Sequence, residues 1–183
     1  MNKLWQWLLN PPINAPRATI LIRLSAGGVF LTEGIMKFIY PSLGVKRFTL
    51  LGFPAPDMMA AFSGGLEIVG GLLIITGFLT RFITIPFIIE MVVATLSTKV
   101  SMYYGTSPLP PPPVPPAAGF WGVIHDVRSE YAQQMADIFL LIVGPGMWSI
   151  DAYLARKKQA RESKRSVREA APDAARIPSA VRI

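Results

Sequence analysis

Charged side chains occur inside four long apolar stretches of this chain, where a charge is costly. At the centre of a bilayer a charge costs roughly 2.5–3.5 kcal/mol on insertion scales, so it must face a partner or a wet cavity. At 100° per residue, these charged residues share helix faces with small or polar residues. Such groups could accept or pass protons, or contact the polar head of a lipid-soluble ligand. The candidate polar core comprises Arg23, Glu33, Lys37, Glu67, Glu90 and Asp137.

Glu67 is the favoured candidate for a functional role in this set. It lies near the middle of its apolar stretch, between Gly64-Gly65 and Gly70-Gly71. Small residues allow a neighbouring helix to approach closely, so this acid should lie against another helix. Glu90 is the second central acid. The structural alternative is that both carboxyl groups serve only to hold helices together by hydrogen bonds.

The remaining charged residues of the core have simpler predicted roles. Glu33 and Lys37 stand four residues apart, in the order that favours an ion pair on a helix. We therefore expect these two side chains to neutralise each other. Arg23 and Asp137 are expected as further partners within the polar core.

The sequence excludes several kinds of redox and metal chemistry. It contains no cysteine, which excludes disulfides, thiol relays and iron–sulfur ligation by this chain. Its single histidine, His125, cannot form a histidine-rich metal or haem site alone. Together with Asp126 and Glu130 it would still need other metal ligands. A solvated loop residue or a helix-start hydrogen bond is the expected role, and no metal site is predicted.

The four apolar stretches predict an all-α integral membrane four-helix bundle. Hydrophobic residues make up 51% of the chain and charged residues only 16%, against roughly 25% in soluble domains. A membrane-spanning helix needs about 20 residues. The predicted spans are residues 18–40, 58–79, 82–101 and 131–153, within a single domain of residues 18–154.

The segments outside the spans have their own predicted roles. Residues 1–17, with Trp5 and Trp7, are expected to form an interfacial segment. Residues 108–116 contain seven prolines and should form a stiff polyproline spacer, with a proline-rich peptide ligand as the alternative. Residues 155–183 are expected to form a basic, disordered tail.

The distribution of charge predicts the orientation of the chain. The tail from residue 155 carries nine Lys/Arg and three acids, whereas the preceding residues carry nine basic and eight acidic groups. A basic segment after a membrane helix favours the cytoplasmic side. Four crossings then predict that both termini are cytoplasmic, in a cell inner membrane. The same distribution argues against a nucleic-acid binder, which would require the apolar stretches to be ordinary core helices.

Short motifs along residues 18–154 resemble, in their order, those of the DoxX family. The first helix and its connector contribute Arg23-Leu24, Gly27-Gly28-Val29-Phe30, Gly34, Lys37-Phe38 and Gly52-Phe53-Pro54-Ala55-Pro56; the second helix and turn contribute Glu67-Ile68-Val69-Gly70-Gly71-Leu72 and Gly77-Phe78-Leu79-Thr80-Arg81; the last part contributes Gly119-Phe120-Trp121-Gly122, His125-Asp126-Val127-Arg128 and Gly144-Pro145-Gly146-Met147-Trp148-Ser149-Ile150-Asp151. The resemblance implies a four-helix bacterial inner-membrane protein. Some members are subunits of thiosulfate:quinone oxidoreductase, and others associate with sulfur or oxidative-stress enzymes. The long proline loop departs from the shorter family pattern.

The resemblance and the acidic core together lead to two hypotheses. In the first, the chain is a membrane subunit of a quinone-linked redox system that has no redox centre of its own, contacts quinone through Glu67 and works with a soluble redox enzyme. In the second, it is a non-enzymatic scaffold or small-molecule carrier that recruits soluble partners. The sequence leaves open whether the chain is itself catalytic and how many copies assemble.

Overall fold

The computed structural model describes residues 3–9, 15–112 and 116–174, and all regular secondary structure in these residues is helical. This confirms the predicted all-α class. The helices are α1 (Lys3–Leu9), α2 (Thr19–Ile39), α3 (Val45–Leu50), α4 (Pro56–Thr76), α5 (Thr80–Tyr103), α6 (Gly119–Asp126), α7 (Arg128–Val143) and α8 (Ile150–Ala174).

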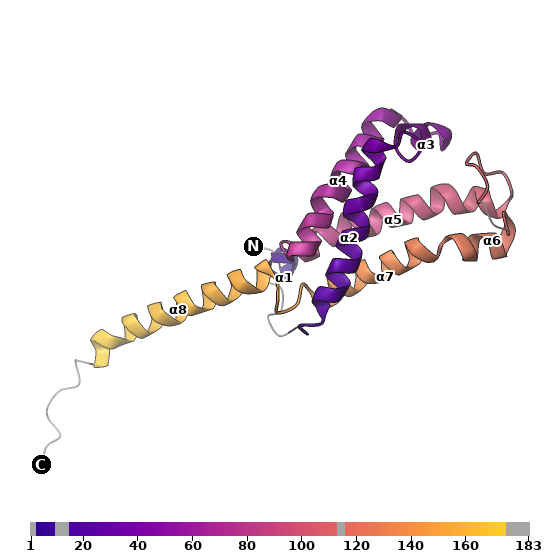
Figure 1. Ribbon diagram of the computed structural model, residues 1–183. Helices are drawn as coiled ribbons and strands as arrows, with labels where there is room; N and C mark the ends of the chain where they lie inside the picture. The colour runs from indigo at the N-terminus through magenta and orange to yellow at the C-terminus, as the bar shows by residue number, and fades with distance from the viewer. Residues whose placement is uncertain (1–2, 10–14, 113–115, 175–183) are drawn as a thin grey trace, which may run out of the picture.

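The long helices form two hairpins that cross each other (Figure 1). Helix α2 packs most extensively against α4, and α5 packs most extensively against α7. The hairpins meet near α1 and the start of α8, and they diverge toward α3 and α6 (Figure 1). A small apolar core, which includes the stacked rings of Phe30 and Phe87 at 3.7 Å, joins the two hairpins.

Helices α2 and α4 lie unusually close because glycines face one another at two levels. A Cβ atom on Gly27 would lie 2.7 Å from the carbonyl oxygen of Gly71. About two helical turns further along, a Cβ atom on Gly34 would lie 2.7 Å from the carbonyl oxygen of Gly64. Small residues at such positions let the helix backbones touch. The predicted close helix approach around Glu67 is therefore confirmed.

Among the residues that the structure describes, three helices are long and apolar enough to cross a membrane, namely α2, α4 and α5. Their outward faces expose large hydrophobic side chains, such as Leu21, Phe62 and Ile89, which suits contact with lipid. The predicted fourth span, residues 131–153, is wrong in its second half. Helix α7 has 16 residues and ends before Gly144, whose φ of 89° and following proline interrupt the helix. The count of four crossings stays a prediction.

Exposed aromatic side chains mark both ends of the helical bundle. At the end formed by the helix connectors they are Tyr40, Tyr103, Tyr104, Trp121 and Tyr131; at the end near the termini they are Trp5, Trp7, Trp148 and Tyr153. Tyrosine and tryptophan are enriched where membranes meet water. The two groups are therefore in the positions expected for residues at the two membrane surfaces.

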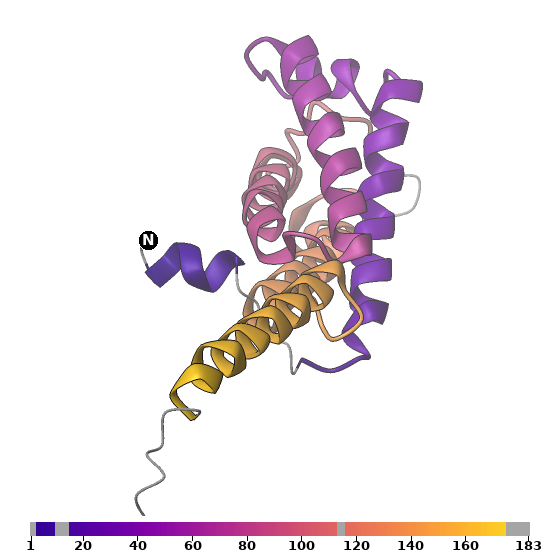
Figure 2. The same ribbon diagram turned by 90° about the vertical axis from the view of Figure 1, so that its left-hand side faces the viewer.

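The basic C-terminal segment is helical rather than disordered through Ala174. Helix α8 projects away from the bundle in both views (Figure 1, Figure 2). Alanine, lysine, arginine and glutamate have high helix propensity, and opposite charges three or four residues apart stabilise a helix. This local preference outweighs the high charge that suggested disorder. Residues 175–183 of the predicted tail and residues 113–115 of the predicted proline spacer lie outside the described residues.

Candidate functional site

A cluster of charged and polar side chains lies inside the bundle, between α2, α4 and α5. The Lys37 Nζ atom lies 2.7 Å from Glu67 Oε2 and donates a hydrogen bond to Ser63 Oγ at 2.6 Å. The Ser63 hydroxyl in turn donates to Glu90 Oε1 at 2.5 Å. We call Lys37, Ser63, Glu67 and Glu90 the polar centre. Each of the three spanning helices contributes at least one member.

The charges of the polar centre do not balance. One ammonium group faces two carboxyl groups, since Lys37 Nζ also lies 3.9 Å from Glu90 Oε1. The side chains of Glu67, Glu90 and Lys37 are only 4%, 15% and 16% exposed. Unbalanced charge is costly in such surroundings. The polar centre becomes neutral when it takes up one proton, so it has the composition of a proton-binding site.

Asp137 on α7 adds another buried carboxyl group. It is fully buried, and neither of its oxygens has a hydrogen-bond partner among the described residues. Glu90 is the charged group that acts on it electrostatically. Burying an ionised carboxylate without a partner is costly, so Asp137 is a second position at which the interior can hold a proton. Its prediction as a polar-core residue agrees with this placement.

Glu33 is not part of the polar centre, which corrects the prediction for this residue. Its side chain is exposed, and Lys37 forms its ion pair with Glu67 rather than with Glu33. The glycine contacts between α2 and α4 bring the acid of α4 within reach of the lysine. A buried partner on a neighbouring helix has replaced the partner predicted on the same helix.

Arg23 is buried, but it lies at the other end of α2 and contacts none of the acids of the polar centre. Its guanidinium donates hydrogen bonds to the carbonyl oxygens of Ile74 at 2.8 Å and Ile75 at 2.5 Å, the last turn of α4. It also donates to the carbonyl oxygens of Pro145 and Trp148, at 3.0 and 2.6 Å. Arg23 therefore satisfies the carbonyls at a helix end and fastens the α7–α8 loop to the first hairpin. The predicted role as a partner in the polar core is wrong.

Asp151 holds the start of α8 against the turn between α4 and α5. Its carboxylate accepts hydrogen bonds from the backbone amides of Leu79 and Thr80, at 3.0 and 3.2 Å, at the start of α5. Its own amide donates to the Gly77 carbonyl oxygen at 3.0 Å. Burial raises the pKa of the Asp151 carboxyl above its usual value, while the two amide hydrogen bonds and the Arg23 charge oppose this rise. Gly77 has a φ of 70°, and a Cβ atom there would lie 2.7 Å from Arg23 Cζ.

The same end of the bundle contains a second buried arginine, Arg81. Its guanidinium donates to the carbonyl oxygens of Trp7 at 2.9 Å and Ile142 at 2.8 Å, and lies 4.2 Å from the Trp7 ring centre. Two of the motifs quoted above, residues 77–81 and 144–151, thus meet in space. They hold the two hairpins, α1 and the start of α8 together at the end near the termini.

Sequence reasoning missed two buried charged residues, Arg81 at the start of α5 and Lys99 near its end. The Lys99 side chain is 7% exposed and lies 2.5 Å from Asp126 Oδ2 and 2.7 Å from Glu130 Oε1. The signal was available, since Lys99 falls inside the third predicted span. His125 on α6 is exposed, and its carbonyl oxygen accepts a hydrogen bond from Arg128. No group of three His, Asp or Glu side chains within the described residues is arranged to hold a metal ion.

The long apolar helices, packed around a buried polar centre with unbalanced charge, identify the chain as a helical membrane protein. Within this class the chain belongs to the DoxX family: the DoxX profile matches residues 18–100. The chain is 41% identical over 157 residues to "Uncharacterized membrane protein Rv3486" of Mycobacterium tuberculosis, covering 85% of this chain and 91% of that protein. It is 23% identical over 141 residues to "Putative oxidoreductase CatD" of Bacillus subtilis, covering 77% and 90%. No solved structure gives a significant match.

Proposed function

We propose that the chain is a membrane subunit of a quinone-linked redox system, in which the polar centre binds and releases protons while a partner carries the electrons. The observation that carries this proposal is the arrangement of Lys37, Ser63, Glu67 and Glu90 on three helices. The family membership and the name of the Bacillus subtilis relative, an oxidoreductase, support a redox context.

The side chains of the polar centre have the chemistry that quinone reduction needs. Reduction of a quinone to a quinol takes up two electrons and two protons, and this chain supplies the protons only. The polar centre can give up the one proton that neutralises it, from Glu67 or Glu90, and Asp137 is the second buried carboxyl group that can hold a proton. The Ser63 hydroxyl links Lys37 to Glu90 by hydrogen bonds. We assign the contact with the quinone headgroup to Glu67. When bound, the quinone would supply the electron-accepting carbonyl groups.

A quinone titration of the purified protein in mild detergent tests this proposal. The unmodified protein should bind decylubiquinone, and Glu67→Gln should weaken binding at least about tenfold, because a hydrogen bond to a charged group contributes about 1.5–3 kcal/mol. Glu33→Gln is the matched control, since it removes an exposed acid of the same kind. Equal binding by the Glu67→Gln variant and the unmodified protein would remove Glu67 from the site. Absence of quinone binding by the unmodified protein would refute quinone as a ligand of this chain.

A second candidate function, recruitment of soluble partners, is favoured by helix α8. This helix projects from the bundle, and its basic side chains between residues 156 and 165 are exposed (Figure 1). Crosslinking in native membranes with the full chain and with a chain shortened after residue 154 separates the two functions. A redox enzyme crosslinked through α8 would support both functions together. Partners without redox activity would favour the scaffold function alone.

We further propose that both termini lie on the cytoplasmic side of a cell inner membrane. The basic side chains of α8 support this orientation, because Lys and Arg near membrane helices favour the cytoplasm. The cysteine-free chain allows a direct test with Ser163→Cys and Ser107→Cys. In intact spheroplasts an impermeant maleimide should label Ser107→Cys alone. Labelling of Ser163→Cys without lysis would show the opposite orientation.

A further inference from the structure

A pocket lies where the two hairpins diverge, at the end of the bundle opposite the termini. Its volume is about 750 Å³, within the range of roughly 300–1,000 Å³ that is typical of small-molecule sites. Its walls come from α3, from the last turns of α5, from α6 and α7, and from the proline-containing loop between them. None of its lining residues belongs to the polar centre. The pocket is therefore separate from the site of the proposed function.

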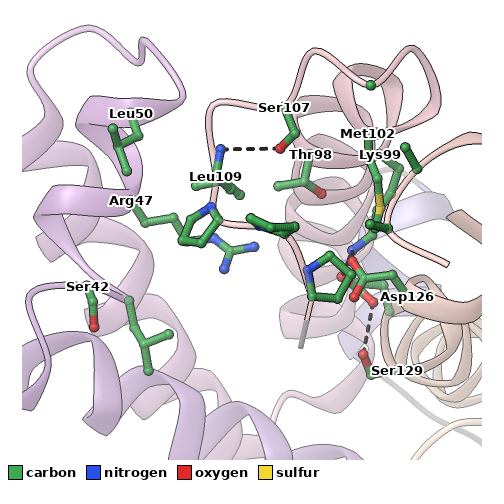
Figure 3. A pocket seen from close by; sticks show the side chains of 18 of the residues that line it. Ser42, Arg47, Leu50, Thr98, Lys99, Met102, Ser107, Leu109, Asp126 and Ser129 are labelled. Atoms are coloured by element: carbon green, nitrogen blue, oxygen red, sulfur yellow. Dashed lines mark hydrogen bonds and ion pairs between the residues drawn. The ribbon is translucent and has the colours of Figure 1, made fainter. Parts of the chain in front are cut away.

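The two walls of the pocket differ in charge. On the α3 side, the side chains of Lys46 and Arg47 have no hydrogen-bond or ion-pair partner within the described part of the chain, and Arg47 extends toward the middle of the pocket in Figure 3. On the opposite side, Asp126 and Glu130 share the single ammonium group of Lys99, which leaves one negative charge in excess. Figure 3 shows Lys99 and Asp126 together on that wall. The pocket thus offers one cationic and one anionic surface.

The rest of the pocket lining combines apolar side chains with the hydroxyl groups of Ser42, Thr98, Ser107 and Ser129. Leu50, Met102 and Leu109 lie in it together with Pro110, Pro111 and Pro112. The pocket also lies at the level of exposed aromatic residues, including Tyr103 and Tyr104 at the end of α5. Aromatic residues of this kind mark the depth of lipid headgroups. A ligand for this pocket should therefore combine a charged head with an apolar body.

We propose that this pocket binds the headgroup of a zwitterionic phospholipid whose head carries both a phosphate and a primary ammonium group. Lys46 and Arg47 hold the phosphate, and Arg47 can donate two parallel hydrogen bonds to it. Asp126 and Glu130 hold the ammonium group of the head, which supplies the positive charge that Lys99 alone does not. The glycerol and the first methylene groups lie against Leu50, Met102 and the prolines.

The test uses the purified full chain in mild detergent and two short-chain lipids with the same tails. Dihexanoyl phosphatidylethanolamine should bind at least about tenfold more tightly than dihexanoyl phosphatidylglycerol, which has the phosphate but lacks the ammonium group. The Lys46→Gln/Arg47→Gln variant should weaken binding of both lipids by at least about tenfold. The Lys157→Gln/Lys158→Gln variant is the matched control, because it removes the same charge from α8 and should leave binding within about twofold.

Asp126→Asn tests the anionic wall separately, since Lys99 keeps Glu130 as its partner. This variant should reduce the preference for phosphatidylethanolamine over phosphatidylglycerol. Equal binding of the two lipids by the unmodified protein would overturn the assignment of the ammonium group. Unchanged binding in Lys46→Gln/Arg47→Gln would overturn the assignment of the phosphate. Free phosphoethanolamine that competes as tightly as the lipid would show that the occupant is a soluble zwitterion and not a lipid.

Discussion

The ion pair between Lys37 and Glu67 allows a quantitative test of the polar centre. Its Nζ and Oε2 atoms lie 2.7 Å apart, which corresponds to an attraction of roughly 6 kcal/mol at an effective dielectric constant of about 20. The cost of burying both charges offsets much of this attraction. Removing one partner removes the attraction but leaves the other charge buried. Each single substitution should therefore lower the free energy of unfolding by more than the net contribution of the ion pair.

Lys37→Met leaves two buried carboxyl groups without an ammonium group, and Glu67→Met leaves Lys37 with Glu90 at 3.9 Å. We expect each single variant to lose about 3 kcal/mol of unfolding free energy. The double variant removes both charges of this ion pair, and the remaining Glu90 carboxyl keeps its hydrogen bond from Ser63. Its loss should also be about 3 kcal/mol instead of the sum of about 6, which gives a coupling energy of about 3 kcal/mol.

Equilibrium unfolding in mixed detergent micelles, followed by tryptophan fluorescence, measures these values. Glu33→Gln provides the control, since it changes an exposed acid on the same helix and should shift stability by less than about 0.5 kcal/mol. If the two single losses add to within about 0.5 kcal/mol in the double variant, the two residues do not act as a pair. The description of a coupled polar centre would then be refuted.

Three further substitutions test the packing and the fastened end of the bundle by the same unfolding measurement. Gly71→Val should cost more than about 2 kcal/mol, because its Cβ atom would lie 2.8 Å from a backbone oxygen, whereas Gly65→Ala, with open space around it, should be nearly neutral. Arg23→Lys should lose about 1.5–3 kcal/mol with the hydrogen bonds that one ammonium group cannot replace, while the exposed Arg17→Lys should change little; equal effects would contradict the role of Arg23. Asp151→Ala should cost about 1–2 kcal/mol by leaving two amides at the start of α5 without an acceptor, and an unchanged stability would show that water replaces it.

The apolar spans were predictable because their pattern is local. The boundaries of α2 and α4 fall within a few residues of the predicted windows, and the glycines around Glu67 predicted a close helix neighbour. Which neighbour lies closest depends on the whole chain. Lys37 therefore paired with an acid on α4 and not with Glu33, although the two lie on the same helix in a favourable order.

Depth along a helix decided the role of Arg23. The face of α2 that includes Lys37 also includes Arg23, but fourteen residues at 1.5 Å each place the two about 21 Å apart. One face therefore serves two sites at opposite ends. The end of α7 depended on Gly144 and Pro145, whose effect on the helix is local and was outweighed in the prediction by the apolar residues on both sides.

The facing glycines of α2 and α4 fix the register of the first hairpin. Gly27 and Gly34 are seven residues apart, and so are their counterparts Gly64 and Gly71, so both contacts exist only in one antiparallel register. One residue inserted between Gly27 and Gly34 would rotate everything after it by about 100° and turn Lys37 away from α4. The spacing of four residues without side chains therefore sets the position of a charge that lies beyond them.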